Sequence, residues 1–221
     1  MSALRDNSEP RRPGRPRGGK RATASREQLL DIALNLFSRQ GIANTSLNAI
    51  AKEAGVTPAM LHYYFNSREQ LLDAMIEERF LPLRSKIGTI FVKHADSPVK
   101  ALTQMVTVLA ELAEQHHWFA PLWMQEVIGE MPVLRTHLHA RFGDEKYQAT
   151  LATVKRWQQE GELNRDLAPE LLFTTLLSLV LVPFSRMRND ERLNALSPEI
   201  IVKHALAVIG AGLGGQSRLD K

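Results

Sequence analysis

The sequence has no cysteine among its 221 residues. Disulfide bonds, thiolate zinc sites and thiol nucleophiles are therefore excluded from the chemistry of the protein. A glycine-rich phosphate-binding loop and a nucleophile elbow are also missing from the sequence. The histidines of the central region lack the i, i+4 spacing that places two imidazoles on one helix face; they are His116, His117, His137 and His139. We therefore expect no enzymatic activity, no bound metal and no cofactor.

Long hydrophobic runs are scarce as well. The most apolar run, Leu171 to Phe184, has only 14 residues and contains two threonines and a serine. A membrane-spanning helix needs about 20 apolar residues, and the N-terminus has no apolar core of the signal-peptide kind. We expect a soluble, cytoplasmic protein with no membrane partner, in which this run is a buried helix.

Segments that alternate apolar and polar residues with period two are also lacking, whereas many stretches follow helical spacing. Serine or threonine followed by proline marks several helix starts. The sequence predicts an all-α protein of about nine helices. Three short helices lie near the N-terminus, and six longer ones follow at 67–88, 98–115, 118–128, 132–160, 168–188 and 197–212.

The positive charge is concentrated at the N-terminus. Residues 1–26 carry a net charge of +6, although the whole chain has a formal charge of only +4. This arm is also rich in proline and glycine, so it cannot fold alone. A basic arm on a mildly acidic body indicates a polyanionic partner at one end of the molecule, although a solubilising tail has the same composition.

The stretch from Thr45 to Leu71 has the spacing of a helix-turn-helix. Two short helices meet at Ala54-Gly55-Val56, which supplies a small residue, a glycine able to take positive φ and an apolar plug. The tripeptide alone also suits an ordinary αα-hairpin. The helix that opens at Thr57-Pro58 has no acidic residue in its first turn, as contact with a phosphate-lined groove requires. Arg68 opens the next helix, where backbone N–H groups already favour an anion.

The same region resembles the N-terminal signature of the tetracycline-repressor (TetR) family over about residues 26–75. The resemblance is carried by Gly41-Ile42, Thr45-Ser46-Leu47, Ile50-Ala51, Ala54-Gly55-Val56-Thr57, Leu61, Tyr64-Phe65 and Ser67-Arg68-Glu69. Three positions depart from the common pattern: Ala59 replaces a glycine, His62 a tyrosine and Arg68 a lysine. The resemblance implies a three-helix DNA-binding domain at 25–71 behind an arm at 1–24. A larger helical effector-binding and dimerisation domain at 72–215 and a tail at 216–221 follow.

Site residues follow from the same resemblance. It implies base contacts by Thr57, Pro58, Ala59, Met60 and Tyr63, and phosphate contacts by Thr45, His62, Tyr64 and Arg68. The base-facing set contains no Arg, Asn or Gln, so we expect DNA shape to contribute to specificity. The arm motif RPGRPRG resembles an AT-hook, which predicts minor-groove entry by Arg15 and Arg17 and phosphate contacts by Lys20 and Arg21.

The second domain is expected to hold a dimer interface and an effector pocket. Its last two helices carry long aliphatic runs and small residues that something must cover, either a second chain or the core of a monomer. By the resemblance, we assign dimer contacts to Leu172, Leu176, Leu179, Ala205 and Gly210. Aromatic and methionine side chains between 98 and 160 suit an apolar pocket, although each alone also suits a core; they are Trp118, Phe119, Trp123, Met124, Met131, Phe142 and Trp157.

Together these patterns predict a homodimeric transcriptional repressor that binds a palindromic double-stranded DNA operator and is released by a small apolar or aromatic effector. Two alternatives remain open from the sequence. One is a DNA-organising protein of the same fold that responds to no effector. The other is an adaptor that binds a protein partner through its aromatic helices.

Overall fold

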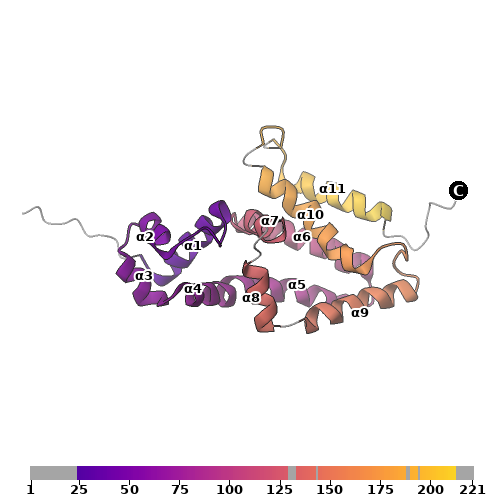
Figure 1. Cartoon of the computed structure of the whole chain (residues 1–221). Helices are drawn as coiled ribbons and strands as arrows, with labels where there is room; N and C mark the ends of the chain where they lie inside the picture. Colours follow the sequence, from indigo (N-terminus) through magenta and orange to yellow (C-terminus); the bar gives the residue numbers. More distant parts are fainter. Residues whose placement is uncertain (1–23, 129–132, 143, 188–189, 194, 213–221) are drawn as a thin grey trace, which may run out of the picture.

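The computed structural model describes residues 24–128, 133–142, 144–187, 190–193 and 195–212, and over these ranges the chain is helical without a strand (Figure 1). The N-terminal domain contains α1 (Arg26–Gln40), α2 (Leu47–Glu53) and α3 (Pro58–Phe65). A continuous helix follows, made of α4 (Arg68–Met75), a π-helical turn η1 (Ile76–Phe80) and α5 (Leu81–Lys93). The C-terminal domain adds α6 (Pro98–Gln115), α7 (Phe119–Ile128), α8 (Val133–Phe142), α9 (Glu145–Gln159), α10 (Pro169–Arg186) and α11 (Pro198–Gly212).

The all-α prediction is confirmed, with one error in the division into helices. The segment predicted as one helix at 132–160 forms two, α8 and α9. Glycine and aspartate are both poor helix formers, and glycine is favoured just past a helix end. The pair Gly143-Asp144 was therefore a stop signal in the sequence that the apolar spacing on both sides concealed.

The three short helices form a compact N-terminal unit because each has a capping residue and a buried face. Ser25 forms a complete capping box with Gln28 at the start of α1. Ser46, Thr57 and Ser67 cap α2, α3 and α4 by accepting a backbone N–H from the first turn. The core of this unit is formed by fully buried side chains from α1, α2 and α3, including Leu30, Leu34, Phe37, Ile50 and Leu61.

The helix α4–η1–α5 connects the two domains, as the lower part of Figure 1 shows. Two ion pairs attach η1 to α1: Arg26 pairs with Glu78 at 2.6 Å, and Arg79 pairs with Asp31 at 3.0 Å. The side-chain hydrogen bond from Arg26, aided by its charge, lowers the pKa of the Glu78 carboxyl. The π-helical turn was not predicted from the sequence, because its residues continue an ordinary helical pattern.

In the C-terminal domain, α10 and α11 pack on α6, and α10 also packs on α7 (Figure 1). By length and composition α10 is the one described helix that is apolar enough to cross a membrane. Its contacts with α6, α7, α9 and α11 make it part of the folded domain instead. However, only 22% of its residues are buried within the chain. An apolar helix with so little covered surface leaves a face for another molecule.

Candidate nucleic-acid interface

The junction between α2 and α3 is a tight turn built by the predicted tripeptide. Gly55 has a φ of +65°, a conformation that side chains with a Cβ rarely adopt. The Val56 N–H then donates to the carbonyl of Ala51 at 3.0 Å and closes the end of α2. Thr57 accepts the Met60 N–H at 3.3 Å, and Pro58 occupies the first turn of α3. These local preferences fix the angle at which α3 leaves α2.

Helix α3 has one face in the core and one face in solvent. Leu61 and Phe65 are buried and hold the helix on the domain. The opposite side exposes Thr57, Pro58 and Ala59, while Met60 is half-buried. Tyr63 is 82% exposed, the highest value among the exposed large hydrophobic side chains. The structure therefore gathers the predicted base-facing residues on one surface of a short helix, which suits entry into a major groove.

Two predicted phosphate contacts lie beside this surface. His62 is exposed, and its ring Nδ1 lies 3.0 Å from the carbonyl oxygen of Asn66. Because a carbonyl only accepts, Nδ1 donates, and Nε2 donates to a phosphate only when the imidazole is protonated. The half-buried Tyr64 packs edge-on against Tyr63, with ring centroids 5.3 Å apart. This contact limits the orientations available to both rings.

The other two residues predicted to contact phosphate, Thr45 and Arg68, make hydrogen bonds within the domain instead. Thr45 is only 2% exposed, and its hydroxyl donates to the carbonyl of Gly41 at 2.7 Å. The half-buried Arg68 donates from Nε to the Thr45 carbonyl at 3.3 Å and from Nη2 to the Ile42 carbonyl. The structure thus does not bring Thr45 to the surface with His62. It uses Arg68 to hold the loop between α1 and α2 against the start of α4.

This role of Arg68 leads to a stability prediction. The Arg68→Ala variant should lose about 1.5–3 kcal/mol of unfolding free energy, because charge-assisted hydrogen bonds to two loop carbonyls disappear. Urea denaturation followed by circular dichroism measures the loss. The matched control is Arg39→Ala, which removes an exposed ion pair with Glu53 and should change stability by less than about 0.5 kcal/mol. Equal losses in the two variants would contradict the anchoring role.

The minor-groove arm, with Arg15, Arg17, Lys20 and Arg21, lies outside the described residues. Its first described neighbours are Ala24 and Ser25, directly before α1. Arg26, the first residue of α1, lies 5.3 Å from the centre of the Phe65 ring in α3. The start of α1, which follows the arm in the sequence, therefore lies beside the C-terminal end of α3.

Three of the seven predicted effector residues, Trp118, Phe119 and Trp157, belong to two aromatic clusters. Trp118 packs against Phe80 and Phe119, with ring centroids 5.2 and 6.0 Å apart. Trp157 is fully buried against Phe91, and its indole N–H donates to the carbonyl of Ala95. Trp123 and Met124 are half-buried on α7. Met131 and the Phe142 side chain lie outside the described part. Effector contact by these residues stays a prediction.

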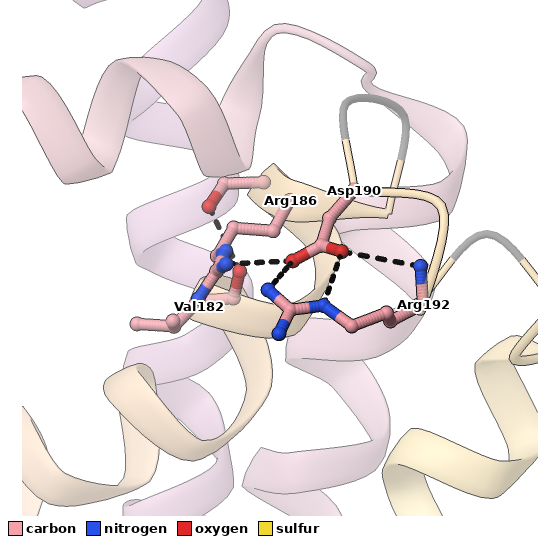
Figure 2. Close-up of polar contacts among 5 residues, drawn as sticks. Val182, Arg186, Asp190 and Arg192 are labelled. Carbon is pink, nitrogen blue, oxygen red and sulfur yellow. Dashed lines mark hydrogen bonds and ion pairs between the residues drawn. The ribbon is translucent and has the colours of Figure 1, made fainter.

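A concave surface of about 590 Å³ lies elsewhere, at the C-terminal end of α10, and none of the predicted effector residues lines it. Figure 2 shows its charged centre, where Asp190 lies between Arg186 and Arg192. The hydrogen bonds from Arg192, together with Arg186, lower the pKa of the Asp190 carboxyl. Both arginines already have an acidic partner. This arrangement holds the connection after α10, and it offers little free charge to a ligand.

The residues predicted for the dimer interface differ in how far the single chain exposes them. Leu172, Leu176 and Ala205 are buried within a single chain and offer little surface to a second one, so dimer contact by these residues stays a prediction. Leu179 is half-buried, and Gly210 is exposed. The exposed apolar side chains of these two helices are instead Leu171, Ile200 and Val208. Helices that are apolar nearly all round gave no periodic signal for choosing the covered face.

Sequence reasoning missed one polar contact between the domains. Gln125 on α7 donates from Nε2 to the carbonyl of Ser38 on α1 at 2.8 Å. Its neighbour Glu126 is buried and accepts two backbone N–H groups of α8. No local sequence pattern marks a contact across 87 positions of the chain.

The tight α2–α3 turn, the exposed face of α3 and the buried anchors behind it define a helix-turn-helix DNA-binding protein. Residues 29–75 match the family described as bacterial regulatory proteins of the tetR family. The transcriptional repressor KstR2 of Rhodococcus jostii is 24% identical over 85% of this chain and 90% of its own length. The regulator AcrR of Shigella flexneri is 41% identical, over 42% of each chain.

Solved structures agree with these relatives. The ketosteroid transcriptional regulator KstR2 of Mycobacterium tuberculosis superposes with a TM-score of 0.65 at 19% identity, over 86% of this chain and 94% of that one. A putative fatty acid metabolism regulator of Clostridium perfringens gives a TM-score of 0.64 at 19% identity, over 83% and 97% of the two chains. Residues 29–75 therefore match the DNA-binding domain of the TetR family, and the chain as a whole has the fold of these transcriptional regulators.

Proposed function

We propose that the protein is a homodimeric repressor that binds a palindromic operator and dissociates when a small apolar or aromatic effector binds its C-terminal domain. The observation that carries this proposal is the exposed face of α3, from Thr57 to Tyr63, held on buried Leu61 and Phe65. That face has no acidic residue. In a bacterial cell, a regulator of this kind acts in the cytoplasm, where the chromosome lies.

The uncovered surface of α10 and α11 supports a dimer. Leu171, Ile200 and Val208 expose apolar side chains on two helices that already contact one another. A second copy of the same two helices covers these side chains most simply, because a two-fold interface pairs a patch with itself. Two recognition helices on one assembly then contact two half-sites, separated by about one turn of DNA.

The release step requires the effector to bind one conformation of the dimer better than the other. Its differential affinity sets the extent to which operator binding falls. Aromatic clusters around Trp118 and Trp157 support an apolar effector, because rings and methionines line most small-molecule sites of this chemistry. Similarity to a ketosteroid regulator supports the same chemical class.

One selection experiment tests the proposal. Purified full-length protein is mixed with fragments of the source genome, and the bound fragments are sequenced and footprinted. We expect a few discrete palindromic sites, from which an apolar small molecule releases the protein. Broad coverage of A·T-rich DNA would indicate a DNA-organising protein, and absence of protection would indicate an adaptor. Either result would overturn the proposal.

The basic arm leads to a prediction about salt dependence. Deletion of residues 1–20 should weaken operator binding and reduce its dependence on salt, because Arg15, Arg17 and Lys20 would no longer displace counterions from the DNA. Loss of the counterions displaced by these three cationic side chains lowers the magnitude of the slope of log K against log salt by about 2 to 3. Titrations at two salt concentrations measure the change. An unaltered affinity at both concentrations would refute a role for the arm.

A further inference from the structure

Two consecutive residues of α7 each hold the end of a different helix. Gln125 donates to the Ser38 carbonyl at the C-terminus of α1. Glu126 accepts the Leu134 N–H at 2.8 Å and the Arg135 N–H at 3.3 Å, at the N-terminus of α8. Helix α7 packs against both α1 and α8, and Figure 1 shows it beside the end of α1, with α8 below it. One short helix therefore connects α1 of the DNA-binding domain to α8 of the C-terminal domain.

The contact at α1 replaces a hydrogen bond that the helix cannot make for itself. Ser38 is among the last four residues of α1, whose carbonyls have no partner within the helix. The Gln125 carboxamide also lies against the backbone that follows, since a Cβ added at Gly41 would be 3.4 Å from Gln125 Oε1. In the described part of the chain, that Oε1 atom is buried with no hydrogen-bond partner.

This unpaired oxygen is informative about the residue. A buried polar atom without a hydrogen-bond partner costs free energy. A leucine of similar size would therefore stabilise the fold more if position 125 served packing alone. The gain from Gln125 is its single directional bond to Ser38. That bond fixes the end of α1 relative to α7, and α1 in turn carries α2 and α3 through the shared core.

The contact at α8 also satisfies backbone groups at a helix end. The N–H groups of Leu134 and Arg135 belong to the first turn of α8 and have no acceptor within the helix. Glu126 supplies the acceptor, and its negative charge suits the positive end of the helix dipole. Burial raises the pKa of the Glu126 carboxyl, whereas the two N–H groups oppose that shift. The position of α8 therefore depends on one buried carboxylate of α7.

We propose that Gln125 and Glu126 are positioning residues that couple α8 to α1, so that a displacement of α8 moves α7 and changes the placement of the DNA-binding domain. This coupling rests on the proposed function, since it describes how an effector-side change reaches the operator-binding surface. Both residues act through the helix ends that they hold, and neither is assigned a contact with DNA or effector.

Hydrogen exchange of the free, full-length protein tests the coupling. In Glu126→Gln, the amides of Leu134 and Arg135 should exchange about tenfold faster, because a charge-assisted acceptor becomes a neutral one. If the coupling exists, the Gly41 amide, which donates to the Phe37 carbonyl, should also exchange about threefold faster. In Gln125→Leu, the Gly41 amide should exchange faster, whereas the exchange of the Leu134 and Arg135 amides should increase less than it does in Glu126→Gln.

The double variant separates coupling from two independent local effects. In the Gln125→Leu background, Glu126→Gln should produce no additional change at Gly41, because the connection to α1 is already broken. The matched control is Gln158→Leu, which removes two side-chain bonds, to the Asn164 and Leu167 carbonyls, within the C-terminal domain. It should leave exchange at Gly41 unchanged. If Glu126→Gln does not fold, Glu126→Asp replaces it, since the shorter side chain withdraws the carboxylate from α8.

If Glu126→Gln speeds amide exchange in α8 but leaves the exchange rate of the Gly41 amide unchanged, the proposal is overturned. An additive effect in the double variant, or an equal response to Gln158→Leu, would also overturn it. The measurement contains neither DNA nor effector. Its failure is therefore distinguishable from failure of the proposed function, which is decided by selection of operator fragments.

Discussion

Tyr63→Ala should lower operator affinity by about 5- to 150-fold while leaving the thermal unfolding temperature unchanged. The tyrosine is the most exposed large side chain of α3, so its removal costs the domain almost no core packing. Loss of one well-placed base contact costs about 1–3 kcal/mol, which corresponds to that range of affinity. Fluorescence anisotropy with a labelled operator fragment, at one fixed salt concentration, measures the change.

The chain provides a matched control for this substitution. Tyr147 on α9 is also exposed but lies in the C-terminal domain, and Tyr147→Ala should bind the operator as the unmodified protein does. Binding to random duplex should fall much less than operator binding in Tyr63→Ala, because base contacts carry specificity. If Tyr63→Ala lost the same factor of affinity for operator and for random duplex, Tyr63 would contact the phosphate backbone, which would contradict its assignment to bases.

Val208→Glu should convert the dimer to monomers and reduce operator affinity by about 100-fold or more. Val208 is 47% exposed on α11, on the proposed two-fold interface, where a two-fold axis would bring two added carboxylates into one apolar contact. Burial of unpaired charge costs several kcal/mol, and a monomer retains only one recognition helix. Sedimentation velocity measures the oligomeric state, and anisotropy on the same sample measures binding.

Val92→Glu is the corresponding control, because Val92 is 81% exposed on α5, whereas the proposed interface is formed by α10 and α11. It should remain dimeric and bind the operator normally. If Val208→Glu also remains dimeric, the exposed face of α10 and α11 is not the interface. A monomeric variant that keeps full operator affinity would instead show that one chain is sufficient for binding.

The N-terminal domain was predictable because its determinants are local. Ser46 and Thr57 cap helices within three residues of themselves, and Gly55 adopts the positive φ expected at the junction. Leu61 and Phe65, which are among the residues that carry the family resemblance, are both buried and hold α3 on the domain. Element identity and the exposed recognition face thus follow from interactions that span only a few positions.

Contacts over long sequence separations were not predictable in the same way. The Arg68 guanidinium donates to the carbonyls of Thr45 and Ile42, 23 and 26 positions earlier, and the Thr45 side chain is buried within the same loop. In the C-terminal domain, the apolar character of α10 indicated that the helix is covered, but not which side is covered by its own chain. Only packing against α6 and α7 shows that Leu172 and Leu176 face inward.

The π-helical turn η1 is the point at which the helix between the two domains can lose one residue and keep its phase. A π-turn contains one residue more than an α-turn, so deletion of one residue within Ile76–Phe80 would leave α5 in phase with α4 as one regular helix. A deletion elsewhere in α4 or α5 would rotate everything beyond it by about 100° around the helix axis. Homologous proteins should therefore tolerate a single-residue gap at this turn more readily than at any other point of the connecting helix.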